Sequence, residues 1–287
     1  KQPIVINDKP IYSALSLGVS LYPSDGEDAQ SLLRKGDNAM YQAKSRGRNG
    51  YAFYDKSFEE ENALRNLCED VLREALATNG FVLHYQPQVS AQTGEIVGFE
   101  ALVRIINEHK GLISPNHFIP LAEELGLIDQ IDEWVFEEAC AQHAIWRRDN
   151  LERTRLSINL SALQLRNDSV LDVYIEIIER HNIAPEDIQL EITENTLIEN
   201  EHTALKILQG FKEYGVSIAL DDFGTGYSSL NCISLYPIDT IKIDRSFVKD
   251  AVDNPKHKAI IEGIVLIASS LNLNIVAEGV ETEEQYE

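Results

Sequence analysis

Apolar residues follow two different spacings along most of the chain, which indicates a mixture of strands and helices. From residue 81 onward, short apolar runs alternate with stretches in which apolar residues recur at helical spacing. Strands that are apolar on both faces, with helices between them, favour a parallel sheet covered by helices. The predicted strands are 81–89, 95–105, 155–161, 188–193, 216–222, 239–244 and 274–279, and the predicted helices include 117–125, 129–148, 164–181, 200–214 and 255–271.

The connection between the first two strands, "SAQTGE", has the length of a hairpin loop, so we expect this pair to be antiparallel. The later strands are separated by helices and are expected to be parallel. An eighth strand would close the predicted seven into a (β/α)8-type, TIM-like barrel. An open doubly wound sheet is the alternative, although no glycine-rich dinucleotide loop follows the first strand.

Residues 1–54 have a different pattern and predict an α+β fragment. The β-rich run "YSALSLGVSLYP" precedes a helical stretch that ends at Gly47, and "YAFY" predicts a closing strand. Two strands and a helix make a poor core alone, so this fragment needs more chain or a neighbouring domain. Residues 55–80 predict a connecting helix with Gly80 at its C-cap position. The predicted division is therefore 1–54, 55–80 and 81–287.

The charge of the chain narrows the set of partners. A formal net charge of −22 argues against binding to a nucleic acid polymer or to an anionic membrane, since either needs a basic surface. A phosphorylated ligand stays possible if metal ions invert the local field. No apolar run is long enough to span a bilayer, and the three cysteines are too few and scattered for a disulfide framework. We expect a cytoplasmic environment.

Polar residues collect at the carboxyl ends of the predicted strands, where a barrel carries its active site. Charges inside otherwise apolar strands are costly unless they are paired or bind a metal ion. Several strands deliver such a residue to the same rim, which a single structural ion pair does not explain. These residues are Glu100, Arg104, Asn159, Glu191, Asp221, Asp222, Lys242, Asp244 and Glu278.

The set contains carboxylates and an amide but no histidine or cysteine, which favours Mg²⁺ or Mn²⁺. It has more carboxylates than one ion needs, so we expect two ions bridged by an aspartate. Asp221 and Asp222 can both reach them if the chain leaves strand geometry there, and Gly224 and Gly226 supply backbone freedom for such a turn. An acidic turn without a metal ion is the alternative.

Lys242 has three possible roles. A Schiff-base nucleophile, as in an aldolase, needs a depressed pKa. The carboxylates at the rim would instead favour the charged ammonium, which could orient an attacking water and stabilise phosphoryl oxygens. A plain salt bridge is the third possibility.

Six segments, in order, resemble the successive signatures of the EAL domain family: "FEALVR" (99–104), "INLSALQ" (158–164), "LEITE" (190–194), "DDFGTGYSSL" (221–230), "IDTIKIDRSFV" (238–248) and "VAEGVET" (276–282). The N-terminal fragment resembles the C-terminal half of a GGDEF (diguanylate cyclase) domain. The resemblance implies a (β/α)8-type barrel with one antiparallel strand. It also implies metal-dependent hydrolysis of cyclic di-GMP to linear pGpG.

The resemblance also implies roles for individual residues. The metal ligands would be Glu100, Asn159, Glu191, Asp221 and Asp222, with Asp221 bridging two ions. The catalytic residues would be Lys242 on the nucleophilic water, Glu278 as ligand or base, and Glu194 as anchor of the loop that begins at Asp222. Gln86, Arg104 and Asp244 would contact the substrate.

Two departures from the family pattern limit these expectations. The GGDEF signature hairpin is absent, so Lys44 and Arg48 are expected to form a solvated helix end, and we expect no cyclase activity. The family continues after "VAEGVET" into a last strand and helix, so we expect a C-terminally incomplete barrel whose activity could be weak. The alternative function is a silent cyclic di-GMP receptor. A homodimer could form through the apolar segment 230–237, which could equally be buried against the barrel.

Overall fold

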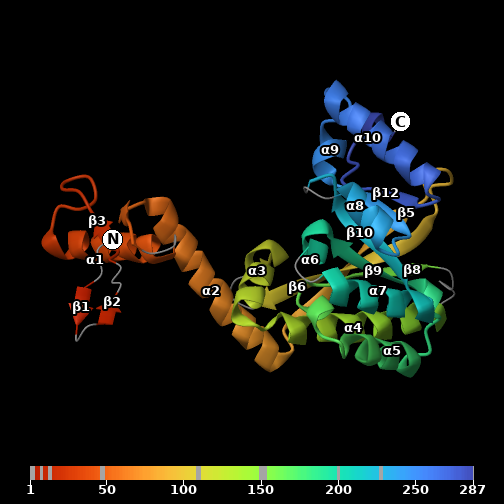
Figure 1. Cartoon of the computed structure of the whole chain (residues 1–287), viewed down its shortest axis with the longest axis horizontal. Helices are drawn as coiled ribbons and strands as arrows, with labels where there is room; N and C mark the ends of the chain where they lie inside the picture. Colours follow the sequence, from red (N-terminus) through yellow and green to blue (C-terminus); the bar gives the residue numbers. More distant parts are fainter. Residues whose placement is uncertain are drawn as a thin grey trace. The chain divides into compact units, whose positions relative to one another are not determined.

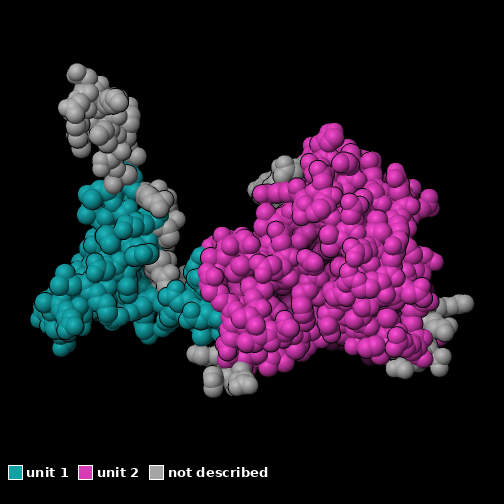
Figure 2. Space-filling model, turned by 90° about the horizontal axis from the view of Figure 1, so that it is seen from below, with its two compact units in different colours: residues 1–71 teal, residues 72–287 magenta. Residues whose placement is uncertain are grey.

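The computed structural model describes residues 4–6, 9–11, 15–45, 49–107, 111–148, 154–198, 201–225 and 229–286. The chain divides into two compact units, residues 1–71 and residues 72–287 (Figure 2). The division falls inside helix α2 (Lys56–Thr78), which occupies the place of the predicted connecting helix. The predicted boundaries at 54 and 80 stay a prediction.

The first unit is built from short strands and one long helix. Strands β1 (Ile4–Ile6) and β2 (Lys9–Ile11) form an antiparallel pair, which the sequence analysis did not predict. Strand β3 (Leu17–Val19) pairs in parallel with β4 (Tyr51–Phe53), and helix α1 (Ala29–Ser45) connects them. Gly18 is required at the contact between β3 and α1, because an added Cβ would lie 1.8 Å from the carbonyl oxygen of Gly36.

The second unit contains the predicted curled sheet of parallel strands. The strand order is β5-β6-β8-β9-β10-β11-β12, so strands adjacent in sequence lie side by side, as in a barrel that is open at β5 and β12. Strand β5 is antiparallel to β6, as the hairpin loop predicted, and the other neighbours on this path are parallel. The strands are β5 (Phe81–Val89), β6 (Ile96–Asn107), β8 (Arg155–Asn159), β9 (Ile188–Thr193), β10 (Ser217–Phe223), β11 (Thr240–Ile243) and β12 (Asn274–Ala277), with a short β7 (Gly111–Ile113) paired to β6.

Helices cover the outside of this sheet, and α4, α5 and α7 lie together along one side of it (Figure 1). The core between these helices is aromatic. The rings of Phe136 and Tyr174 stack with centroids 3.8 Å apart, and both side chains are buried. The helices of this unit are α3 (Pro115–Leu125), α4 (Ile128–Arg148), α5 (Val170–Arg180), α6 (Glu194–Ile198), α7 (Glu201–Tyr214), α8 (Ser229–Leu235), α9 (Arg245–Lys249), α10 (Pro255–Ser270) and α11 (Glu283–Tyr286).

The predicted helix over 164–181 is wrong in its first part. A 3₁₀ turn covers Gln164–Arg166, and α5 begins only at Val170. The break has a local cause, because the side chain of Asn167 accepts hydrogen bonds from the backbone N–H and the hydroxyl of Ser169. Asparagine competes in this way with helical hydrogen bonding.

Several predicted strands end earlier than expected. Strand β8 ends at Asn159 rather than 161, β11 ends at Ile243 rather than 244, and β12 ends at Ala277 rather than 279. Asp244 is instead the N-cap of α9 and accepts a hydrogen bond from the backbone N–H of Ser246. Asn159 is therefore the last residue of its strand, and Asp244 and Glu278 each directly follow theirs.

Truncating Phe136 to alanine should lower the free energy of unfolding by about 3–5 kcal/mol, because it removes a buried ring and leaves a cavity. Urea denaturation followed by circular dichroism measures this change. The control is Ile145→Ala on the same helix, where the side chain is 47% exposed and a loss below about 1 kcal/mol is expected. Equal losses in the two variants would contradict the assignment of Phe136 to the core.

Candidate active site

Lys242, on β11, lies at the centre of a cluster of carboxylates. Its side chain is 1% exposed, and its ammonium donates hydrogen bonds to Glu191, to Glu100 at 3.2 Å and to Asp221 at 3.1 Å. Glu278 makes a further ion pair, with Oε1 2.8 Å from Nζ. An ammonium has only three N–H donors, so four carboxylates exceed what Lys242 can hydrogen-bond.

The register of the sheet brings these residues together. Asn159 and Glu191 are paired neighbours on β8 and β9, and Asn159 donates a hydrogen bond to Glu100 on β6 at 3.1 Å. Glu191 lies on β9 and Lys242 on β11, so their contact passes over the intervening strand β10. A sheet must be strongly curled for such a contact to form across its concave face.

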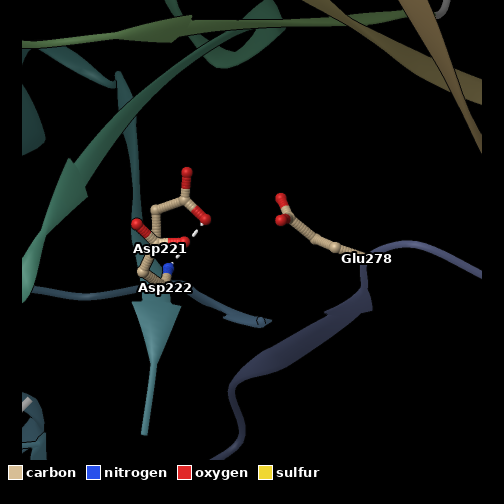
Figure 3. Close-up of side chains that lie close together, drawn as sticks. All are labelled: Asp221, Asp222 and Glu278. Carbon is tan, nitrogen blue, oxygen red and sulfur yellow. Dashed lines mark hydrogen bonds between the residues drawn. The ribbon is translucent and has the colours of Figure 1, made fainter. Parts of the chain in front are cut away.

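The two adjacent aspartates are arranged by a backbone turn. Asp222 has a φ of 54°, in the left-handed region that few residues other than glycine adopt, and Gly224 follows with a φ of 96°. The pairing of β10 with β11 shifts register between Leu220 and Phe223. The backbone N–H of Asp222 donates to Oδ1 of Asp221 at 2.8 Å (Figure 3). The chain therefore leaves strand geometry at Asp222, which is the condition that the sequence analysis set for both aspartates to reach the same ions, while Gly226 lies outside the described residues.

The turn places three carboxylates around one point. Figure 3 shows Asp221, from the end of β10, pointing toward Glu278, which follows β12. Carboxylate oxygens of Asp221, Asp222 and Glu278 lie within 4.8 Å of one another, close enough to hold a metal ion.

Glu194 lies behind this turn. It is the first residue of α6 and is 3% exposed. Its Oε1 accepts a hydrogen bond from the backbone N–H of Gly224 at 3.1 Å. This contact ties the loop after β10 to α6.

The residues expected to bind substrate lie around the cluster with different contacts. Asp244 shares a hydrogen bond with Asp222 and so belongs to the cluster. Gln86 is exposed and is the cross-strand partner of Glu100 on β5. Arg104 lies four residues after Glu100 on the same face of β6, and its Nη1 donates to the carbonyl of Val103. Among the ion pairs of the described residues, none joins Arg104 to the cluster.

Burial and neighbouring carboxylates shift the pKa values of the cluster. Burial raises the pKa of Glu191. The charge of Lys242 opposes this shift, and the charges of Glu100 and Asp221 reinforce it. Burial also raises the pKa of Asp222, with further contributions from Asp221 and Asp244. Burial opposes the charge of Lys242, but the surrounding carboxylates raise its pKa above the ordinary value. A raised pKa contradicts the Schiff-base alternative, which needs a neutral amine.

The donor set fits a divalent cation. All groups around the cluster offer oxygen, the preferred ligand of Mg²⁺ and Mn²⁺. Within the described residues, Oε1 of Glu191 is buried and has no hydrogen-bond partner, although Oε2 contacts Lys242. A buried carboxylate oxygen without a donor is costly, and a cation would satisfy it.

Comparison with protein-family models confirms the resemblance that the six sequence motifs indicated. A model of the EAL domain matches residues 69–287, and a model of the diguanylate cyclase GGDEF domain matches residues 1–50. The chain belongs to the EAL domain family. It carries, in addition, a fragment of a GGDEF domain at residues 1–50.

Two similar proteins are named for the activities they carry. The chain is 42% identical over its whole length to the bifunctional diguanylate cyclase/cyclic di-GMP phosphodiesterase MucR of Pseudomonas aeruginosa, and it covers 42% of that protein. It is 38% identical over 99% of its length to the cyclic di-GMP phosphodiesterase NbdA of the same species, and it covers 36% of that protein. The chain thus spans less than half of each relative.

A solved structure shares the fold of the second unit. The PaMucR phosphodiesterase in complex with c-di-GMP has a TM-score of 0.73 and 43% sequence identity, over 77% of this chain and 89% of that one. This confirms the predicted TIM-like EAL fold.

Two features were not resolved by sequence patterns. A row of buried polar residues, Ser157, Gln189 and Thr240, lies in the sheet and was not singled out. The sequence did contain a signal for this row, because each of its three residues stands two positions before a polar residue of the rim. The candidate dimer segment 230–237 overlaps α8. Within this segment Cys232, Ile233 and Tyr236 are buried, and Leu235 is 41% exposed. The described part of this segment therefore packs mainly against its own domain.

Replacing Glu191 by glutamine should stabilise the protein in EDTA, because it removes a buried carboxylate whose pKa is raised and preserves its volume. A carboxyl group whose pKa is higher in the folded than in the unfolded protein stabilises the folded state most when the pH is below its ordinary pKa of 4.5. This stabilisation is lost as the pH rises through the pKa of the folded state. The wild-type free energy of unfolding should therefore fall more steeply than that of Glu191→Gln between about pH 5 and about pH 8.

Urea denaturation at a series of pH values measures these slopes. Glu213→Gln, at an exposed position of α7, is the matched control and should follow the wild type. Parallel slopes for wild type and Glu191→Gln would contradict the raised pKa of the buried Glu191 carboxyl group.

Proposed function

We propose that this chain binds cyclic di-GMP and hydrolyses one of its phosphodiester bonds, giving linear pGpG, with two Mg²⁺ or Mn²⁺ ions. The observation that carries the proposal is the group of four carboxylates around Lys242, with a buried oxygen of Glu191 that lacks a donor. The naming of MucR and NbdA as cyclic di-GMP phosphodiesterases, together with the c-di-GMP complex of the similar structure, supports the choice of substrate.

The proposed metal ligands follow the two parts of the cluster. Glu100, Asn159, Glu191 and Asp221 would hold one ion. Asp222, together with Asp221, would hold a second. Such ions lower the pKa of bound water and stabilise charge on phosphoryl oxygens.

The remaining residues act on water and substrate. Lys242 stays protonated in its carboxylate surroundings, so its ammonium can orient the attacking water and stabilise negative charge on the phosphoryl group. Glu278 has a side chain that is 27% exposed at the edge of the cluster, where it can accept the proton of that water. Glu194 holds the Asp222 turn through Gly224.

Substrate contacts are proposed for three residues that surround the cluster. Gln86 and Arg104 lie on the hairpin β5–β6, beside Glu100, and can contact guanine and phosphate groups. Asp244, held by Ser246 at the N-terminus of α9, lies next to Asp222. Although partial burial acts in the opposite direction, hydrogen bonds from Ser246 lower the pKa of Asp244, so it stays ionised.

Helix length, cysteine burial and the domain surface bear on the location and the assembly of this protein. Within the described part of the chain, every helix is too short or too polar to cross a lipid bilayer. The three cysteines are buried free thiols, which supports a reducing, cytoplasmic environment. A homodimer through the EAL domain stays a proposal, and sedimentation velocity would test it.

The full chain incubated with cyclic di-GMP and Mn²⁺ should release pGpG, and EDTA should abolish this turnover. Asp221→Asn and Glu100→Gln should each lower kcat by about 10²–10³-fold, because each removes charge that stabilises the reacting phosphoryl group. Chromatography of the products measures both effects, and circular dichroism confirms that the variants fold.

Glu213→Gln serves again as the control and should leave turnover unchanged. Turnover that persists in EDTA, or in Asp221→Asn, would contradict a metal-dependent site at this cluster. Binding of cyclic di-GMP without turnover by the wild type would favour the receptor alternative.

A further inference from the structure

A second row of polar side chains lies directly beneath the proposed metal site. Its members are almost completely buried, at 0–1% exposure. Each stands two residues before a residue of the site on the same strand, so both side chains point to the same face. The pairs are Ser157 and Asn159 on β8, Gln189 and Glu191 on β9, and Thr240 and Lys242 on β11.

These side chains form one continuous chain of hydrogen bonds. The hydroxyl of Ser157 donates to Oε1 of Gln189 at 3.1 Å, and Nε2 of Gln189 donates to the hydroxyl of Thr240 at 2.8 Å. At the other end, Nε2 of Gln88 on β5 donates to Ser157 at 3.4 Å. The chain therefore runs from β5 to β11 across the concave face of the sheet.

Two of its links join strands that are not neighbours. Gln189 reaches Thr240 over β10, and Gln88 reaches Ser157 over β6. The contact between Glu191 and Lys242 passes over the same strand, β10, two residues further along β9 and β11. Gln189–Thr240 and Glu191–Lys242 are therefore successive links between the same two strands.

Stability alone does not account for a polar row in this place. Interior layers of such barrels are usually filled by branched apolar residues, and a buried amide is costly unless all its groups are paired. A hydrogen bond, unlike apolar packing, fixes distance and direction between its partners. The row thus sets the separation of β9 and β11 just below Glu191 and Lys242.

We propose that Ser157, Gln189 and Thr240 are positioning residues: their hydrogen bonds hold β8, β9 and β11 at the spacing that Asn159, Glu191 and Lys242 need to form a divalent-metal site. The inference rests on the proposed function, because it concerns the same site. It assigns a role to residues that touch neither metal nor substrate.

Thr240→Val tests the proposal, since valine keeps the shape of threonine but removes the hydroxyl that Gln189 needs. Loss of residues that support metal ligands typically weakens metal binding by about 10–100-fold, so the Kd for Mn²⁺, measured by titration calorimetry on the full chain, should rise by a factor in this range. The kcat for cyclic di-GMP should fall while KM changes little. Thr240→Ser keeps the hydroxyl and should restore both values to near those of the wild type.

Further variants separate positioning from stability. Ser157→Ala removes the other hydroxyl without adding volume and should weaken Mn²⁺ binding in the same way, which provides a second test if Thr240→Val does not fold. Ile188→Val changes a buried residue of β9 that faces away from the row, and it should lower stability without changing the Kd for Mn²⁺.

Wild-type Mn²⁺ affinity in both Thr240→Val and Ser157→Ala would overturn the inference, as would a Thr240→Ser variant that binds Mn²⁺ as weakly as Thr240→Val. These results differ from a failure of the proposed function, which would appear as absent Mn²⁺ binding and absent turnover in the wild-type chain itself.

Discussion

The site depends on the imbalance of charge around one buried ammonium. Lys242 is surrounded by Glu100, Glu191, Asp221 and Glu278, and a single positive charge cannot neutralise four acids in a place with little access to water. Burial raises the pKa of Glu191, and Glu100 and Asp221 add to this shift, while the surrounding carboxylates raise the pKa of Lys242 against the effect of its burial. A cluster like this is unfavourable for stability alone. Its presence is understandable if the folded state is completed by divalent cations, which would satisfy the oxygen that Lys242 does not reach.

The fold supplies the geometry for this cluster in two ways. The curl of the sheet lets side chains on β9 and β11 meet across β10, so residues that are far apart in sequence converge on one concave face. The left-handed backbone at Asp222 then bends the end of β10 and points a second aspartate toward the same region, with Glu194 holding the following loop through Gly224. Neither feature would serve without the other, since a flat sheet would separate Glu191 from Lys242 and a regular strand would turn Asp222 away from Asp221.

Much of the fold and the residues of the cluster could be predicted from the sequence, because the apolar strands and their polar ends follow a repeating pattern. The antiparallel first pair followed from the length of one loop, and a departure from strand geometry at Asp222 was the condition for Asp221 and Asp222 to reach the same metal ions. Competition between side chains and the helical backbone for hydrogen bonds was harder to predict. The side chain of Asn167, for example, accepts hydrogen bonds from Ser169, and α5 begins only after these residues. The row of Ser157, Gln189 and Thr240 was missed because its meaning lies in contacts between non-neighbouring strands, which spacing along one strand does not reveal.

The most direct test of the central claim is the position of a bound metal ion. Crystals of the full chain soaked in Mn²⁺ and measured near the manganese absorption edge would locate the ion by its anomalous signal. The account predicts a peak at coordination distance from Asp221 and from the unpartnered Oε1 of Glu191, with a second peak near Asp222. A chain that hydrolyses cyclic di-GMP in the presence of Mn²⁺ yet shows no anomalous peak among these carboxylates would contradict it.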